Sequence, residues 1–96
     1  MAMTEIDYRL SAPRPIEIEI RDSEGSLIDD ALIQIRFVSA GVCFSANGVF
    51  FDGLYSFDIS QSRVVAERKY NVDIYYSDVN GWVWIGEFKL QVIGGC

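Results

Sequence analysis

The most constraining feature of this sequence is a hydrophobic pattern of period two, interrupted at short intervals by turn residues. In Ile16–Arg21, apolar and charged residues alternate strictly. Such alternation indicates a β-strand with one buried face and one solvated face. Alternating or apolar stretches recur at a spacing of roughly ten residues, which is typical of all-β domains. They are Ile33–Phe37, Val42–Ser45, Val49–Phe51, Tyr55–Ser60, Tyr70–Tyr76 and Phe88–Val92.

These segments predict an all-β fold of about seven to eight strands. No long 3.6-residue period is present, so we expect antiparallel sheets with one solvated face each. For 96 residues, the strand count favours a single immunoglobulin-like antiparallel β-sandwich, with a small β-barrel as the second choice. The sandwich is expected to span residues 16–93. Residues 1–15 are expected to form an N-terminal arm or edge strand, and residues 94–96 a flexible tail.

A turn, a helical turn and one tyrosine can also be predicted within the sandwich. Asp52-Gly53 is expected to turn the chain into the strand that starts near Tyr55, and the only stretch suited to a helical turn is 61–69. Tyr70 has two interpretations. In the first, its hydroxyl forms a hydrogen bond with the upstream backbone, as in a tyrosine corner. In the second, it is simply the first inward residue of its strand.

The residue types present argue against an enzyme. The chain has no histidine, which removes Ser-His-Asp and Cys-His catalysis and most zinc sites. It contains no glycine-rich phosphate loop, paired-cysteine motif or nucleophile elbow. Asp29 and Asp30 are adjacent in an extended chain, so their carboxylates point to opposite faces. Turn chemistry explains the calcium-loop-like run Asp78–Gly81. We therefore expect no catalytic, cofactor-binding or metal-binding residues and no cofactor.

Charge and cysteine usage limit the partners. The net charge of −6 disfavours nucleic acid, which requires a basic face. The first residues lack a secretory signal, and no apolar run is long enough for a bilayer span, so we expect cytoplasmic synthesis and no membrane partner. Cys43 is interpreted as a small buried hydrophobe. Cys96 follows two glycines, and an intermolecular disulfide through it stays open.

The last predicted hairpin can be assigned a register. A two-residue loop at Asn80-Gly81 would place apolar and charged side chains on one face, which parity rejects. A three-residue loop, Val79–Gly81, makes the inward face apolar and gives Gly81 the left-handed conformation. The resulting inward pairs are Tyr76 with Trp84, Ile74 with Gly86, Val72 with Phe88, and Tyr70 with Leu90.

This register leaves apolar side chains on the outward face. Tyr75, Val83 and Ile85 would form a patch there, which is either a protein contact surface or is covered by the N-terminal segment Ile6–Leu10. Trp82 and Trp84 would point inward as core, although Trp82 at the hairpin tip also suits an interface anchor. The candidate interface residues are Tyr75, Val83, Ile85, Trp82, Ile6, Tyr8 and Leu10. Asp73 would face Glu87, a like-charge pair that either Lys89 or a bound cation would relieve.

The segment Ile16–Ile35 has an order of features that is found in a known group of domains. It contains an apolar alternation, then Arg21-Asp22, an acidic turn at Gly25 and a second alternation. This pattern resembles the opening strands of small immunoglobulin-like modules, and within them the N-terminal domain of upper baseplate proteins of tailed phages. Phe57–Ser60, Tyr70–Ile74 and Gly86–Val92 are similar to the later strands. The resemblance implies a structural, non-enzymatic protein.

Two function classes follow as expectations. The first is a non-enzymatic structural protein of the phage virion: a baseplate, tail, fibre-attachment or head-decoration subunit. It would contact other virion proteins and copies of itself, and it would reside in the virion. The alternative is a small acidic phage-encoded effector that binds and inhibits a host protein. Its acidic residues are interspersed with arginines, which argues against mimicry of nucleic acid.

Overall fold

The computed structural model describes residues 4–22, 24–28, 31–37 and 44–94, and it is all-β in these segments. Asp29, Asp30, Cys43 and Cys96 lie outside the described residues, so the expectations for them stay untested. The strands are β1 (Thr4–Arg9), β2 (Ile16–Ile18), β3 (Ile33–Phe37), β4 (Ser45–Asn47), β5 (Val49–Phe51), β6 (Leu54–Phe57), β7 (Arg68–Asp78) and β8 (Gly81–Ile93). The segment 61–69 forms turns and extended chain, so the predicted helical turn is wrong.

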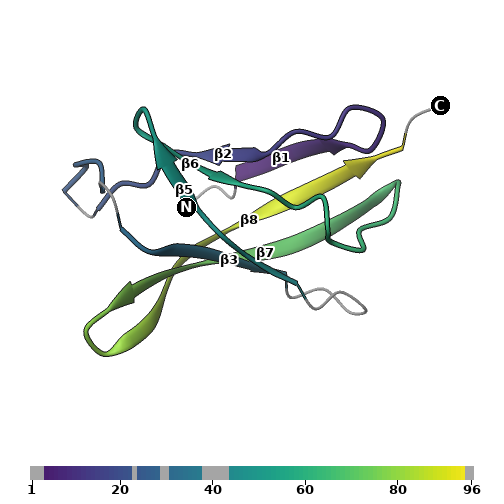
Figure 1. Cartoon of the computed structure of the whole chain (residues 1–96). Coiled ribbons are helices and arrows are strands. Elements are labelled where there is room, and N and C mark those ends of the chain that lie inside the picture. The colour runs from purple at the N-terminus through teal and green to yellow at the C-terminus, as the bar shows by residue number, and fades with distance from the viewer. Residues whose placement is uncertain (1–3, 23, 29–30, 38–43, 95–96) are drawn as a thin grey trace.

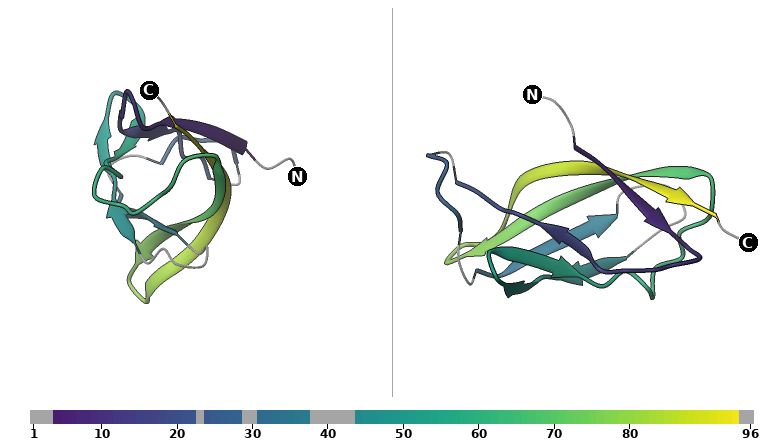
Figure 2. Two further views of the ribbon diagram at one scale, coloured as in Figure 1. Left: turned by 90° about the vertical axis from the view of Figure 1, so that its right-hand side faces the viewer. Right: turned by 90° about the horizontal axis from the view of Figure 1, so that it is seen from above.

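The strands form two sheets that enclose a common core (Figures 1 and 2). The larger sheet has the order β1-β8-β7-β3-β4 and the smaller one the order β2-β6-β5. The all-β, two-sheet architecture predicted from the period-two pattern is therefore confirmed. The described strand pairs are antiparallel except β1 with β8, which run parallel. A parallel edge pair is possible because β1 continues into β2 of the other sheet rather than into β8.

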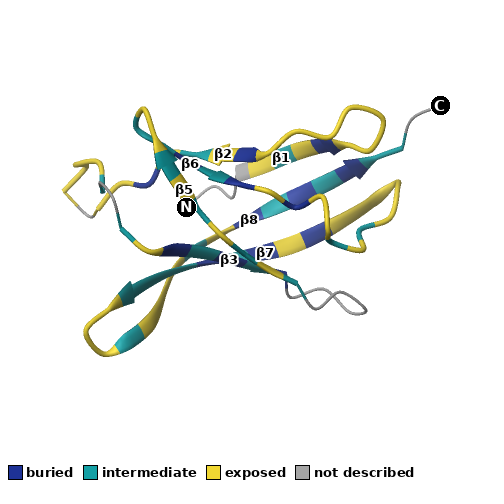
Figure 3. Cartoon of the chain, in the orientation of Figure 1, coloured by how far each residue is buried: buried dark blue, intermediate teal, exposed yellow. Residues whose placement is uncertain are grey.

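The core is built from the inward residues of both sheets. Ile35, Tyr55, Phe57, Val72 and Leu90 are fully buried, at 0% exposure. In Figure 3, buried positions alternate with exposed or half-buried ones along β7 and with half-buried ones along the C-terminal part of β8, as the sequence pattern predicts. The distal end of the β7–β8 hairpin lies outside this core and is half-buried or exposed.

One turn and one tyrosine fit their sequence signals. Asp52 and Gly53 both have positive φ, 53° and 82°, as a two-residue hairpin turn between β5 and β6 requires. The Val65 N–H donates a hydrogen bond of 3.0 Å to the Tyr70 hydroxyl. The bond from a buried tyrosine to the upstream backbone is therefore confirmed.

The β7–β8 register agrees with the prediction in the body of the hairpin and differs at its tip. The pairs Tyr70 with Leu90, Val72 with Phe88, Asp73 with Glu87 and Ile74 with Gly86 are as predicted. A β-bulge follows, because Tyr75 pairs with Trp84 and leaves Ile85 as the extra residue. The predicted pair of Tyr76 with Trp84 is thus wrong, and Tyr76 pairs with Val83. Gly81 has a φ of 112°, which agrees with its predicted positive φ. Asp78 pairs with Gly81, so the loop is Val79-Asn80 and the predicted three-residue loop is wrong.

Tyr8 in β1 provides a pH-dependent contribution to stability. Burial of its hydroxyl, with a smaller effect of the Asp58 charge, raises the pKa of Tyr8. The Ser60 N–H, which lies 2.9 Å from Asp58, and the Ser60 hydroxyl lower the pKa of Asp58 and keep it ionised. The neutral Tyr8 is favoured in the folded chain, whereas an unfolded tyrosine titrates near pH 10.0. The free energy that folding gains by keeping Tyr8 neutral is fully present below pH 10.0. It is lost as the pH rises through the raised pKa of Tyr8.

We therefore expect Tyr8→Phe to reduce the alkaline loss of stability. Urea unfolding of wild type and Tyr8→Phe at pH 7 and at about pH 11 measures this loss in each protein. The difference in free energy of unfolding between the two proteins at pH 7 is the reference against which the difference at high pH is compared. If both lose the same free energy of unfolding between the two conditions, Tyr8 does not contribute.

Candidate functional site

The strongest candidate for a contact site is a cluster of aromatic side chains on the outer face of the larger sheet. Tyr75 lies on this face because its neighbours Ile74 and Tyr76 pack against the core. The bulge brings Trp84 opposite Tyr75 and Trp82 opposite Ser77, so both tryptophans share the outer face with Tyr75. Trp82 is 42% exposed and Trp84 52% exposed. We call Tyr75, Trp82 and Trp84 the aromatic face.

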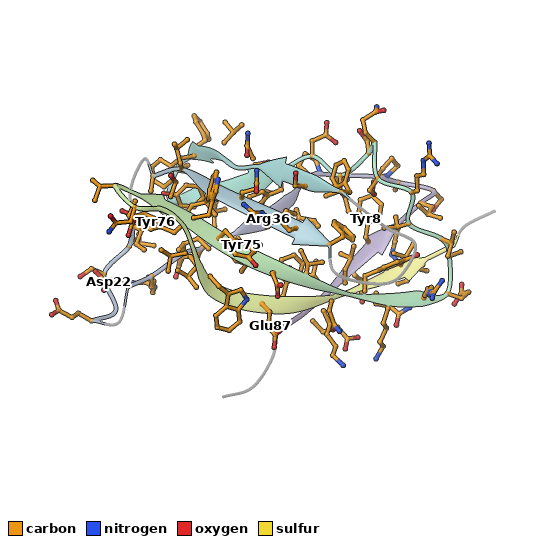
Figure 4. All side chains as sticks on the ribbon, turned by 90° about the horizontal axis from the view of Figure 1, so that it is seen from below. Tyr8, Asp22, Arg36, Tyr75, Tyr76 and Glu87 are labelled. Atoms are coloured by element: carbon orange, nitrogen blue, oxygen red, sulfur yellow. The ribbon has the colours of Figure 1, made fainter. Side chains whose placement is uncertain are left out.

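Arg36 of β3 packs against the aromatic face from the strand next to β7. Its guanidinium carbon lies 4.1 Å from the centre of the Tyr75 ring and 5.5 Å from that of Trp82. Both distances suit cation–π contacts. The Arg36 Nε also donates to Gln34 Oε1, and the Gln34 amide donates to Asn47 Oδ1 at 3.0 Å. Figure 4 shows Arg36 beside Tyr75.

Ion pairing does not hold Arg36 in place. In the described segments, the ion pairs within 4.0 Å are Arg21 with Glu19 and Lys69 with Glu5. Asp73 pairs with Arg36 in the β3–β7 register, yet the guanidinium packs on the rings instead. The arrangement presents aromatic rings and one cation on a common surface, and these residue types dominate the energetics of protein interfaces.

The structure separates the predicted interface residues into three groups. Tyr75 and Trp82 lie together on the aromatic face, so the prediction that both tryptophans point inward is wrong. Val83 pairs with the inward Tyr76, and Ile85 is the bulge residue beside the groove described below, so these two do not join Tyr75 in a patch. In the N-terminal segment, Ile6 and Tyr8 pack in the core and Leu10 is 40% exposed.

A second feature is an apolar groove of 870 Å³ between the β7–β8 hairpin and the segment of residues 19–22 and 24–28. We call this segment the arm, and it is separate from the N-terminal residues 1–15. The arm folds back on itself. The Ile28 N–H donates a hydrogen bond to Ile20 O at 3.0 Å, and Arg21 forms an isolated antiparallel β-bridge with Leu27. The groove is lined by Ile6, Ile18, Glu19, Ile20, Arg21, Asp22, Ile28, Ile74, Tyr76, Ile85, Glu87 and Phe88. Its walls are therefore largely isoleucine, while charged side chains lie at its rim.

The acidic side chains of the described segments do not gather into a metal-binding cluster of three or more. Asp73 does pair with Glu87, as predicted. The Asp78 carboxylate accepts a hydrogen bond of 2.7 Å from the Asn80 N–H and so stabilises the hairpin turn. The turn chemistry proposed for Asp78–Gly81 is thus visible in the structure.

Comparison with protein-family models, curated proteins and solved structures found no match to this chain. In the segments that the structure describes, no helix has the length and apolar character needed to cross a bilayer.

Proposed function

We propose that this chain is a non-enzymatic structural subunit of a phage virion that works through protein–protein contacts, with the aromatic face as its main contact surface. A baseplate, tail, fibre-attachment or head-decoration position suits such a subunit. The partners are other virion proteins and copies of itself. The virion assignment rests on the resemblance of Ile16–Ile35 to baseplate immunoglobulin-like modules.

The observation that carries the contact function is the exposure of Trp82 and Trp84 beside the Tyr75–Arg36 pair. Large apolar side chains scattered singly on a surface need no explanation, but tryptophan, tyrosine and arginine grouped together are typical of an interface centre. Arg36 packs against the rings of Tyr75 and Trp82, and restricting side chains before binding reduces the conformational entropy lost when a partner binds.

Two measurements test this proposal. Mass spectrometry of purified phage particles should detect the chain at a fixed ratio to the major virion proteins. Size-exclusion chromatography with light scattering should detect oligomers of the purified chain or complexes with virion proteins. A strictly monomeric chain that is absent from particles would eliminate the proposal. Capture of a single host protein by a chain absent from particles would instead support the effector alternative.

We expect Trp82→Ala with Trp84→Ala to abolish incorporation into particles and to change the free energy of unfolding by less than about 1 kcal/mol, since neither ring belongs to the core. The control is Phe51→Ala, because Phe51 is a 79% exposed aromatic residue on β5 of the other sheet. Quantitative mass spectrometry of particles and urea unfolding measure the two effects. Equal incorporation of the double variant and the Phe51→Ala control would show that the aromatic face is not the contact surface.

A further inference from the structure

We propose that the apolar groove is a second binding site, which takes an extended segment of a different protein as an added β-strand. The segment would pair with the edge of β8 at Gly81–Glu87 and insert alternate apolar side chains into the groove. Basic residues would flank its apolar core. This site uses the backbone edge of β8 and the groove on the inner side of the larger sheet, whereas the aromatic face uses outer side chains of the same hairpin. The inference does not depend on the virion assignment.

The edge of β8 is the first observation that supports strand addition. β8 pairs with β7 along its length, but on its other side β1 pairs only with Phe88–Ile93. No described strand pairs with Gly81–Glu87 on that side. An exposed strand edge presents a row of backbone N–H and C=O groups that can pair with another chain. An added strand would continue the row that β1 begins.

The shape and chemistry of the groove are the second observation. Six of its lining residues are isoleucines, and Tyr76 and Phe88 complete the apolar surface. Ile85, the bulge residue of β8, lies both on the free edge and in the groove lining, which joins the two features. Side chains along a strand alternate between faces, so a segment paired with β8 would direct every second side chain into the groove.

Charge at the rim selects the partner. Glu19, Asp22 and Glu87 line the groove together with a single cation, Arg21. Arg21 pairs with Glu19 at 2.5 Å, so Asp22 and Glu87 carry the uncompensated charge. Figure 4 shows Asp22 on the arm and Glu87 on β8. The chain as a whole has a net charge of −6, which further favours a partner segment with lysine or arginine at its ends.

Charge also argues against a second copy of this chain at this site. Each copy has a net charge of −6, so pairing two copies edge to edge through β8 brings two acidic surfaces together, which is unfavourable. A heterologous partner with basic residues avoids this repulsion.

The test uses the full chain and a fluorescein-labelled peptide with valine and threonine in alternation and lysines at both ends. Fluorescence anisotropy measures its affinity, and amide hydrogen exchange locates it. We expect saturable binding and slower exchange of amides within Gly81–Glu87. A peptide of the same composition without the alternation should bind at least about tenfold more weakly. A peptide with glutamates at both ends should also bind more weakly.

Ile85→Lys provides the specific variant, since it places a charged group in the groove at a position that is already 40% exposed. Val79→Lys is the matched control, because it makes the same charge change at a fully exposed loop position outside the groove. We expect Ile85→Lys to weaken binding at least about tenfold and Val79→Lys by less than about twofold. No saturable binding, equal binding to both lysine variants, or protection outside Gly81–Glu87 would overturn the inference.

Discussion

Gly48→Ala is expected to lower the free energy of unfolding by about 2–3 kcal/mol, because no room exists for a methyl group where the chain crosses between the sheets. Gly48 follows β4 of the larger sheet and precedes β5 of the smaller one. A Cβ atom there would lie 2.9 Å from Cε1 and Cζ of Phe57 and 3.3 Å from Cδ1 of Tyr55. Both rings are fully buried at 0% exposure, so neither can move away without disturbing the core.

The physical cause can be isolated with a double-mutant cycle. Phe57→Leu shortens the side chain that the new methyl group would meet. If the cost of Gly48→Ala is a steric clash with the Phe57 ring, it should shrink in the Phe57→Leu background. Urea unfolding of the two single variants and the double variant gives the coupling free energy, which we expect to be at least about 1 kcal/mol.

Two outcomes would contradict this explanation. A near-zero coupling would mean that Gly48→Ala lowers the free energy of unfolding for another reason, namely by disturbing the hydrogen bond of 2.8 Å from the Gly48 N–H to Ile33 O. A stable Gly48→Ala variant would mean that the two sheets are less closely packed at this crossing than the structure has them. Gly53→Ala is a useful comparison, since Gly53 needs glycine for its φ of 82° and its Cβ would have only a Leu27 methyl at 4.0 Å.

The β7–β8 hairpin shows which part of a strand register can be predicted from the sequence and which part cannot. The predicted register is correct for Tyr70–Ile74, because those residues face the core and a slip of one position would bury charged side chains. Beyond Ile74 the hairpin is half-buried or exposed, so burial penalises a change of register less strongly. A bulge at Ile85 therefore carries no cost that a parity argument would detect, and parity places the tryptophans on the wrong face.

Other features depend on contacts that are distant in the sequence. Asn47-Gly48 has the sequence signal of a turn, yet it forms the crossing between the two sheets, and nothing local distinguishes the two cases. Arg36 is absent from the predicted site residues, since its contact with Tyr75 exists only after β3 and β7 pair. The signal that would have identified it is an arginine on the polar face of the alternating segment Ile33–Phe37.

Tyr55→Phe is expected to destabilise the fold by about 2–3 kcal/mol, because one buried hydroxyl satisfies two backbone groups. The Tyr55 hydroxyl donates to Ile28 O at 2.7 Å and accepts from the Ala31 N–H at 3.1 Å. These bonds fix both ends of the connection between the arm and β3 to the smaller sheet. Phenylalanine keeps the ring packing but leaves a carbonyl and an N–H without this partner, beside a ring that is closed to water.

A graded tyrosine series separates this hydrogen-bonding effect from a general loss of hydroxyl groups. Tyr70→Phe removes a single bond, from the Val65 N–H, next to a residue that is 51% exposed and open to water, so we expect a cost of about 1 kcal/mol. Tyr75→Phe alters a ring on the outer face and should change stability by less than about 0.5 kcal/mol. Urea unfolding of the three variants should rank the costs as Tyr55, Tyr70 and Tyr75. Equal costs for Tyr55→Phe and Tyr75→Phe would mean that the Tyr55 hydroxyl does not anchor this connection.

The anchored arm forms one wall of the apolar groove, so Tyr55→Phe should also weaken binding of the alternating peptide, whereas Tyr75→Phe should not.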